Sequence, residues 1–380
     1  MRNAYQQICP VLFGVGVIAD LPEKVRELGG GRVLCICDAG LKSAGVADRL
    51  VQSLRDAGIE TDLFDEVEAD APDTIINKAG EIVRSRDYGV VIGLGGGSSM
   101  DSAKAVALLA EKPGVIADYY LTAHMGERVK LILIPTTSGT GSEVTPMAVI
   151  HDTVNEIKAA IIRPADYAIL DPALTVSVPP KVTAYTGMDA LSHAVEAFTS
   201  AESCLSPHSD LLALEAVRLI AQNLKTAVED GSDLAARSAL AFASNIAGIA
   251  FSESSVHAGH AIAHEAGVRL SLPHGLICAL ATPVVIEYYA HLFPERMQRL
   301  AAALGVETAP EEAGAKAAAA VRALSKAVGI PSLKDLGVRR EDAVDCAQGA
   351  VDHNIFIVTA PSPTGVPEIA EMLGRIYDQD

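Results

Sequence analysis

The pattern of apolar residues changes once along this chain of 380 residues, near residue 180. Before that point, short apolar runs that predict strands alternate with amphipathic stretches that predict helices. The strands are expected at residues 32–37, 61–64, 88–94 and 129–134, and the helices at residues 47–57 and 74–86. Strands that alternate with helices predict a parallel sheet covered on both faces. We therefore predict an α/β domain over residues 1–180.

The second half of the chain carries no further strand pattern and is rich in Ala and Leu. Its last long stretch has Thr308 three residues before Glu311, the spacing of a capping box at a helix start, and it stops at Gly329. Helices are expected at residues 211–229, 234–251, 254–266 and 310–328. We therefore predict an all-helical domain over residues 181–380.

The net charge argues against several classes of partner, and the cysteines indicate the compartment. The formal net charge is −18, and no basic stripe is present to bind a nucleic-acid backbone or an anionic membrane surface. No run approaches the roughly 18 apolar residues of a membrane-spanning helix. The six cysteines are scattered without a C-x-x-C spacing, which fits a reducing compartment. We expect a cytoplasmic protein without nucleic-acid or membrane partners.

Histidines are concentrated in one short segment. His257, His260, His264 and His274 stand within eighteen residues of a chain that holds ten histidines. The first three are three and four residues apart, so on a helix they would share one face. The fourth directly follows Pro273, where we expect a loop rather than a helix.

Asp189 and His193 form a second polar pair, four residues apart on a predicted helix. One carboxylate and several imidazoles, offered from two helices and a loop, suit a divalent transition metal. The alternative is a set of ordinary surface or core histidines, which is the more common role of any single histidine. The spacing alone does not decide which of the histidines would be ligands.

A glycine-rich turn, Gly95 to Gly97, joins the predicted strand at residues 88–94 to a helix start. Backbone N–H groups in such a turn can approach a pyrophosphate, although a purely structural turn is the alternative. Asp38, at the end of an earlier strand, could accept hydrogen bonds from a ribose and would repel a 2′-phosphate, which favours NAD over NADP. The Thr, Ser and Gly residues at positions 136–142 suit a loop bordering the dinucleotide, but such clusters are commonly plain turns.

Together these segments resemble the iron-containing (group III) alcohol dehydrogenase family. That family has the dehydroquinate synthase-like two-domain fold, with an N-terminal Rossmann-like parallel sheet and a C-terminal helical bundle. The matching motifs are GGGSSMDSAK at 95–104, PTTSGTGSEVT at 135–145, GMDALSHAVEAF at 187–198 and HAIAH at 260–264, followed by LPHG. The resemblance covers nearly the whole chain.

The resemblance implies specific roles for individual residues. The metal ligands would be Asp189, His193, His260 and His274, and His264 would lie beside nicotinamide and substrate as a catalytic proton relay. His257 matches no ligand, so a structural or supporting role is expected. The dinucleotide would be bound by Asp38, Gly96, Gly97, Ser98, Asp101, Thr136, Thr137, Ser142 and Lys158.

The implied activity is an NAD-dependent, metal-dependent oxidoreductase that interconverts a small primary alcohol or diol and its aldehyde. Fe²⁺ is the expected metal, with Zn²⁺ possible, and a homodimer or larger homo-oligomer is expected. A zinc-dependent polyol (glycerol-type) dehydrogenase and a maleylacetate-type reductase stay open as alternatives. A lyase of the dehydroquinate synthase type would need a basic cluster, and residues 181–290 are poor in Lys and Arg. Residues 360–365 depart from the Pro-Arg that many members carry there, so the resemblance does not determine the chemistry of the substrate pocket near the C-terminus.

Overall fold

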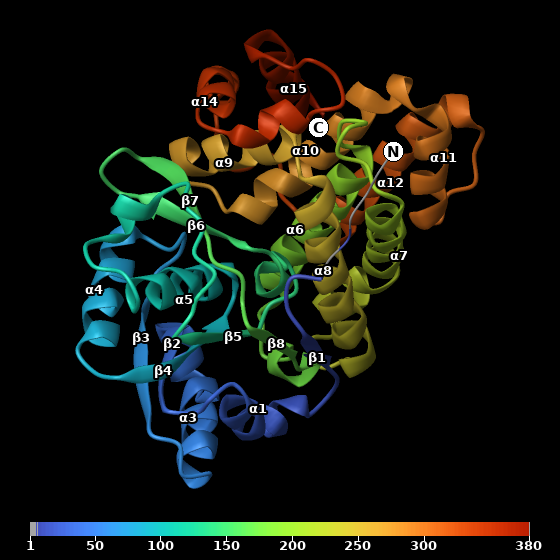
Figure 1. Ribbon diagram of the computed structural model, residues 1–380. Helices are drawn as coiled ribbons and strands as arrows, with labels where there is room; N and C mark the ends of the chain where they lie inside the picture. The colour runs from blue at the N-terminus through green and yellow to red at the C-terminus, as the bar shows by residue number, and fades with distance from the viewer. Residues whose placement is uncertain (1–4, 6, 380) are drawn as a thin grey trace. The chain divides into compact units, whose positions relative to one another are not determined.

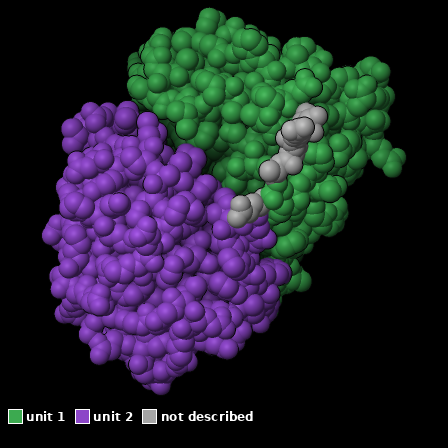
Figure 2. All heavy atoms as spheres, viewed as in Figure 1, with its two compact units in different colours: residues 1–5, 138–140, 178–380 green, residues 6–137, 141–177 purple. Residues whose placement is uncertain are grey.

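The computed structural model describes residue 5 and residues 7–379 (Figure 1), so residues 1–4, 6 and 380 of the predicted domains lie outside the description. The chain packs as two compact units, coloured separately in Figure 2. Among the described residues, the unit that we call the sheet unit contains residues 7–137 and 141–177, and the helical unit contains residue 5 and residues 138–140 and 178–379. The long helical segment thus begins close to the predicted change of pattern at residue 180.

The sheet unit is built on six parallel strands in the order β1-β8-β5-β4-β2-β3. The strands are β1 (Val11–Phe13), β2 (Arg32–Asp38), β3 (Thr61–Val67), β4 (Tyr88–Gly95), β5 (Lys130–Pro135) and β8 (Tyr167–Leu170). An antiparallel pair, β6 (Met147–Asp152) and β7 (Ile157–Ile162), forms a separate two-stranded sheet that the sequence analysis did not predict. The helices of the unit are α1 (Leu21–Glu27), α2 (Ala39–Ser43), α3 (Val46–Asp56), α4 (Asp73–Arg84) and α5 (Gly97–Leu109).

Helices cover both faces of this sheet, as parallel strands require. Alternate residues of β2 and β4, such as Cys35 and Ile92, are fully buried in one core with residues of α1 and α3. Gly93, which points to the other face, lies so close to α5 that a Cβ atom there would approach Ala103 to 2.7 Å. Figure 1 shows α1 and α3 on one side of the sheet and α4 and α5 on the other.

The strand order places a topological switch point between β2 and β4. After β2, the chain moves outward to β3 and then returns to pair β4 with the opposite edge of β2. The connections that leave β2 and β4 therefore diverge at their carboxyl ends, and open α/β sheets bind their ligands at such a point. Asp38 ends β2 and Gly95 ends β4, so both lie at this switch point.

The described part of the helical unit contains helices and turns but no strand, and the predicted α/β plus all-helical fold class is confirmed. The apolar helix α10 packs against α6, α9, α12 and α15 at its centre. The helices are α6 (Pro180–Thr199), α7 (Pro207–Glu229), α8 (Leu234–Ser254), α9 (Ala258–Leu270), α10 (His274–Tyr289), α11 (Pro294–Ala303), α12 (Pro310–Ala327), α13 (Arg340–Val344), α14 (Ala347–Asp352) and α15 (Val366–Asp378), with a 3-10 turn, η6 (Ile355–Thr359), before α15.

Two helices of this unit are long and apolar enough to cross a membrane by length and composition alone. They are α8 and the stretch from His274 to Leu292, and 56% and 67% of their apolar windows are buried inside the protein. Core helices of globular proteins have the same composition, and these two contribute directly to the helical core.

The structure corrects three local predictions. The predicted helix at residues 254–266 instead begins at Ala258, because Ser255 adopts a left-handed conformation (φ 67°) that ends α8. His257 therefore precedes α9 and shares no helix face with His260. Conversely, His274 lies not in a loop but at the first position of α10, since Pro273 occupies the N-cap, where its missing N–H costs nothing.

The predicted capping box of α12 is also wrong. The N-cap residue is Ala309, which has no side-chain cap, and the hydroxyl of Thr308 donates to the Ala309 carbonyl instead. Pro310 at the first helical position favours the helix start instead, because its fixed φ angle suits a helix and its missing N–H needs no partner there.

Hydrogen bonds tie the break between α8 and α9 to the C-terminal segment. The hydroxyl of Thr359, in η6, donates to the Val256 carbonyl (2.6 Å), and the Thr359 carbonyl accepts from the backbone N–H of Ala201 (2.9 Å). The hydroxyl of Ser200 donates to the Ser255 carbonyl (3.2 Å). Carbonyl groups of the irregular backbone between the two helices thus accept hydrogen bonds from neighbouring segments, as buried polar groups require.

Candidate active site

Helix α6 carries a polar face on an otherwise buried helix. Asp189, His193 and Glu196 are spaced four and three residues apart, so they follow one face over two turns. Their exposed fractions are 3%, 6% and 0%. Nδ1 of His193 lies 4.0 Å from Oδ2 of Asp189. Burying three such groups is costly unless they are paired or bind a cation.

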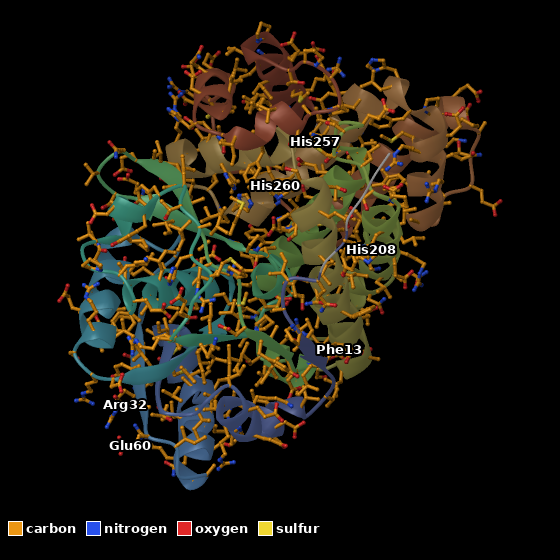
Figure 3. All side chains as sticks on the ribbon, viewed as in Figure 1. Phe13, Arg32, Glu60, His208, His257 and His260 are labelled. Carbon is orange, nitrogen blue, oxygen red and sulfur yellow. The ribbon has the colours of Figure 1, made fainter. Side chains whose placement is uncertain are left out.

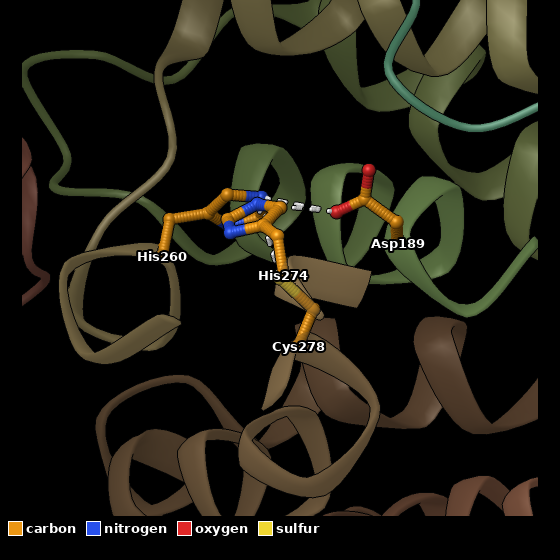
Figure 4. A group of neighbouring side chains, drawn as sticks. All are labelled: Asp189, His260, His274 and Cys278. Carbon is orange, nitrogen blue, oxygen red and sulfur yellow. Dashed lines mark hydrogen bonds and ion pairs between the residues drawn. The ribbon is translucent and has the colours of Figure 1, made fainter. Parts of the chain in front are cut away.

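Helices α9 and α10 bring two further histidines to Asp189 (Figure 4). Nε2 of His274 lies 3.5 Å from Oδ1 of Asp189, and Nε2 of His260 lies 3.8 Å from the same oxygen. Gly275 permits this approach, because a Cβ atom there would overlap the Tyr185 carbonyl of α6. The two imidazoles and the carboxylate therefore converge on one point.

A cysteine completes this group. Asp189, His260, His274 and Cys278 each offer one ligand atom, and these four atoms all lie within 4.8 Å of one another. Cys278 is four residues after His274 and so faces the same side of α10. Among the described residues, this is the group of His, Cys, Asp and Glu side chains that could hold a metal ion.

His193, the remaining predicted ligand, lies beside this group rather than within it. Its ring stacks on that of His260 at a centroid distance of 4.4 Å and on Phe251 at 4.3 Å. The structure thus groups three of the four predicted metal ligands with Cys278, which the sequence analysis missed, and places His193 next to them.

Glu196 holds His260 in place. Its Oε1 lies 3.0 Å from Nδ1 of His260, and its Oε2 accepts the backbone N–H of His257. Burial would raise the pKa of Glu196, but His257 and His260 lower it to about 2. A carboxylate on Nδ1 leaves Nε2 of His260 as the nitrogen that can bind a metal.

His257, whose role the sequence left open, supports this arrangement. It is fully buried, and its Nε2 lies 3.0 Å from the Thr199 hydroxyl while its ring packs edge-on against Tyr289. Figure 3 shows His257 and His260 on neighbouring parts of the helical unit.

The electrostatics of the cluster suit a cation. Burial lowers the pKa of His193 to about 3, so this imidazole is neutral near pH 7, as a metal ligand must be. Burial would raise the pKa of Asp189, but His193, His274 and His260 hold it below its usual value, so the carboxylate is ionised. A dication would therefore keep a net positive charge after binding one carboxylate and neutral imidazoles.

Two buried polar atoms without a hydrogen-bond partner indicate whether the site suits a metal ion. Oδ1 of Asp189 and Nδ1 of His193 are both buried without a hydrogen-bond partner in the described part of the chain. Buried polar atoms are rarely left in this state, because each costs about 1–3 kcal/mol. Oxygen and nitrogen donors of this kind fit Fe²⁺ or Zn²⁺. The residues present therefore fit a transition metal.

His264 lies one turn after His260 on α9 and is half-buried. Its Nδ1 lies 3.0 Å from Oδ1 of Asn354, and its ring centroid is 5.1 Å from that of His274. Phe356 packs edge-on against it at 5.5 Å. Because an amide oxygen accepts, Nδ1 carries the proton and Nε2 is the nitrogen able to take up another.

The predicted dinucleotide residues gather at the carboxyl ends of the parallel strands. Asp38 caps α2, with Oδ1 accepting from the Leu41 N–H (3.0 Å). Gly96 and Gly97 lead into α5, and Thr137 lies against Gly96. Thr136 follows β5, where its N–H donates to the Gly95 carbonyl (2.9 Å). These residues share the switch-point region of the sheet.

Four predicted dinucleotide residues contact protein groups that the sequence analysis did not consider. Asp101 accepts from the Ser142 hydroxyl (2.6 Å), and Ser142 also accepts from the fully buried Lys104 (2.8 Å). Lys158, on β7, pairs with Asp70 at 2.6 Å. Ser98 accepts from the Asp70 N–H (3.0 Å). These four residues thus have structural partners of their own, and their cofactor role stays a prediction.

Two family profiles match the chain almost end to end. Residues 10–172 match the one described as iron-containing alcohol dehydrogenase, and residues 183–377 match the one described as Fe-containing alcohol dehydrogenase family, C-terminal. The chain belongs to the iron-containing alcohol dehydrogenase family. It is therefore an oxidoreductase of the alcohol dehydrogenase class, as the sequence motifs predicted.

Individual members of the iron-containing alcohol dehydrogenase family are similar over their full lengths. The 1,3-propanediol dehydrogenase of Klebsiella pneumoniae is 36% identical over 376 residues, which cover 96% of each chain. The NAD-dependent methanol dehydrogenase of Bacillus methanolicus is 32% identical over 95% of this chain and 96% of its own. A crystal structure of sulfoacetaldehyde reductase from Bifidobacterium kashiwanohense in complex with NAD⁺ has a TM-score of 0.89 at 29% identity, and the match covers both chains fully.

The two site residues that the sequence analysis missed had a signal in the sequence. Glu196 lies within the family motif at 187–198 and continues the helix face of Asp189 and His193. Cys278 follows His274 by one helical turn, a relation that is visible only if His274 is recognised as a helix start.

Proposed function

We propose that this protein is an NAD-dependent, metal-dependent dehydrogenase that interconverts a small primary alcohol or diol and its aldehyde. The observation that carries the proposal is the convergence of Asp189, His260 and His274, with His193 stacked beside them, in a largely buried cluster in which two potential ligand atoms have no hydrogen-bond partner among the described residues. The similarity to a methanol dehydrogenase and a 1,3-propanediol dehydrogenase supports a small alcohol or diol as substrate.

In this proposal, Asp189, His193, His260 and His274 hold a divalent ion, with Fe²⁺ as the expected metal and Zn²⁺ as the alternative. A dication at this site supplies Lewis-acid chemistry, which lowers the pKa of a hydroxyl group near it. Glu196 keeps His260 in the required tautomer, and the partly buried ring of Phe251, stacked on His193, restricts the freedom of that imidazole.

His264 handles the substrate proton in this proposal. Its Nδ1 is engaged by Asn354, so Nε2 can accept the hydroxyl proton during oxidation and return it during reduction. Phe356 and Asn354 fix the imidazole plane, so the accepting nitrogen is held in one orientation.

The sheet unit binds the dinucleotide that accepts the hydride. Gly96, Gly97, Thr136 and Thr137 border the switch point where a pyrophosphate would lie against the start of α5. Asp38 carries a negative charge at the end of β2, which favours a ribose hydroxyl over a 2′-phosphate and so favours NAD over NADP. We further propose that the enzyme is cytoplasmic and a homodimer or larger homo-oligomer.

Anaerobic purification followed by metal analysis and a substrate screen tests this function. The screen would measure NADH oxidation with short aldehydes, and NAD⁺ reduction with methanol, 1,3-propanediol and glycerol, after loading with Fe²⁺ or Zn²⁺. We expect turnover of at least one aldehyde–alcohol pair that chelation abolishes and metal restores. A fully metal-loaded protein without turnover of any pair would contradict the proposal.

A further inference from the structure

Cys278 stands inside the candidate metal centre, although the proposed function assigns it no role. It is fully buried, and Sγ lies 3.5 Å from Nε2 of His274 and 3.9 Å from Nε2 of His260. The same two nitrogen atoms lie 3.5 Å and 3.8 Å from Oδ1 of Asp189. Sulfur and oxygen therefore stand at nearly equal distances from the same pair of imidazoles.

These distances match the edges of a tetrahedral metal site. With metal–nitrogen and metal–oxygen bonds of about 2.0–2.1 Å and a metal–sulfur bond of about 2.3 Å, ligand atoms lie about 3.3–3.6 Å apart. Four of the six distances among the ligand atoms of Asp189, His260, His274 and Cys278 run from 3.5 to 3.9 Å, and no two of these atoms are more than 4.8 Å apart.

A second observation points to a ligand at the same place. Oδ1 of Asp189 is buried and accepts no hydrogen bond from the described residues, yet two imidazole nitrogen atoms and the Cys278 sulfur surround it. The other cysteines differ: Cys35 and Cys37 are buried within β2, and Cys346 donates to the Asp342 carbonyl. Only Cys278, among the described cysteines, belongs to a group of potential ligands.

We propose that Cys278 is a further ligand of the metal bound by this protein, and that its sulfur raises the affinity of the site for thiophilic ions, namely Co²⁺ and Zn²⁺, the alternative metal of the proposed function. The ligand set would then be one oxygen, two nitrogens and one sulfur, with His193 adjacent as the fifth donor. Formation of the metal–sulfur bond releases the thiol proton to solvent, so metal uptake is accompanied by proton release. A soft sulfur donor favours Zn²⁺ and Co²⁺ over harder ions. This inference rests on the proposed metal site.

Cobalt substitution tests the inference without measuring activity. Metal-free full-length protein is titrated with Co²⁺, and the near-ultraviolet absorption that a thiolate ligand gives to Co²⁺ is recorded at one equivalent. X-ray absorption of the Zn²⁺ form then tests for a sulfur neighbour at about 2.3 Å. We expect both signals in the wild-type protein and in Cys346→Ser, a control at another buried cysteine. Both should be absent in Cys278→Ser, and its Zn²⁺ affinity should fall at least tenfold.

The outcomes separate this inference from the proposed function. A wild-type protein that binds one Co²⁺ per chain without a thiolate band or a sulfur neighbour overturns the role of Cys278 and leaves the metal-dependent function intact. A wild-type protein that binds no metal overturns both. Since the wild-type spectra alone decide the sulfur question, a Cys278→Ser variant that does not fold would not affect the conclusion.

Discussion

The Glu196 carboxylate lies 3.0 Å from Nδ1 of His260, and the two side chains are 0% and 2% exposed. The same carboxylate also accepts the backbone N–H of His257 just before α9. One side chain of α6 thus fixes both the start of α9 and the orientation of an imidazole on it. Nε2 of His260 is thereby directed at Asp189.

The first prediction concerns this carboxylate. Glu196→Gln keeps the shape of the side chain but removes the charge that holds the His260 tautomer, so metal affinity should fall about 10–100-fold. Competition with a chromophoric chelator measures the affinity, and circular dichroism checks the fold. Glu215→Gln, which removes a partly exposed partner of Arg218, should leave the affinity unchanged. Equal affinities of Glu196→Gln and wild type would exclude the positioning role.

Two glycines of α9 form a matched pair for a packing prediction. In an open helix, Gly→Ala stabilises by about 0.5–1 kcal/mol. A Cβ atom on Gly259 would instead overlap the Glu196 carboxylate, which His257 and His260 prevent from moving, whereas one on Gly267 would meet only the Leu272 carbonyl at 3.4 Å. We expect Gly259→Ala to lower the thermal midpoint and the metal affinity together. If Gly267→Ala proved the more damaging of the two, this account of α9 would be wrong.

Removal of His274 should separate the two binding functions. Because this side chain is 31% exposed, His274→Ala should fold, lose most of its metal and keep NAD⁺ binding within about threefold of wild type, a change of less than about 1 kcal/mol. Metal per chain is measured by mass spectrometry and NAD⁺ binding by calorimetry. His353→Ala, a partly exposed histidine paired with Glu265, serves as the control and should keep both. Parallel loss of metal and NAD⁺ would indicate general misfolding.

Asp38 has two roles that one substitution can separate. It caps α2 through Leu41, and its charge is proposed to exclude a 2′-phosphate. Asn is as good an N-cap as Asp, so Asp38→Asn should keep the stability of the protein while it lowers the preference for NAD over NADP. Asp38→Gly should lower the preference as well. The ratio of kcat/KM for the two cofactors is the readout, and an unchanged ratio in both variants would remove Asp38 from cofactor selection.

Acid should weaken the sheet unit through Glu111. Burial would raise the pKa of this carboxyl, but the backbone N–H groups of Val129, Glu127 and Arg128 lower it. A folded pKa below the unfolded value of about 4.3 means that the stabilisation is complete above that pH and is lost as the pH falls.

The free energy of unfolding of the variant Glu111→Gln should therefore be about 1–3 kcal/mol lower than that of wild type at pH 7. Its unfolding free energy should also change less than that of wild type when the pH falls from about 4.3 to 3. Urea titrations at several pH values measure both quantities. Glu127→Gln, at an exposed position, should behave as wild type, and identical pH slopes for wild type and Glu111→Gln would count against this assignment.

The pattern of apolar residues along the sequence correctly predicted helices and strands that are regular and buried. The run YGVVIGL predicted β4 to within one residue because every one of its side chains except Gly89 is buried, and a fully buried strand reads as a continuous apolar run. Helix α12 was predicted to within one residue at each end, because Pro310 and Gly329 are strong local signals. The four predicted metal ligands came from a family resemblance, and the fold explains their convergence through the close contact at Gly275.

Tertiary contacts decided the features that local patterns missed. Ser255 accepts a left-handed conformation because hydrogen bonds from Ser200 and Thr359 hold the segment, and no local pattern predicts that. The β6–β7 hairpin was missed because four of the six side chains of β7 are only partly buried and give no alternation. Cys278 was not considered as a ligand, since its partners lie on another helix or one turn away.

Thr359 stands far from the histidines in sequence but anchors the backbone that leads into them. In the proposed metal site, the position of the ligands therefore depends partly on a region that supplies none of them. We therefore expect substitutions in this C-terminal segment to change how firmly the proposed site retains a metal, even when every coordinating side chain stays the same.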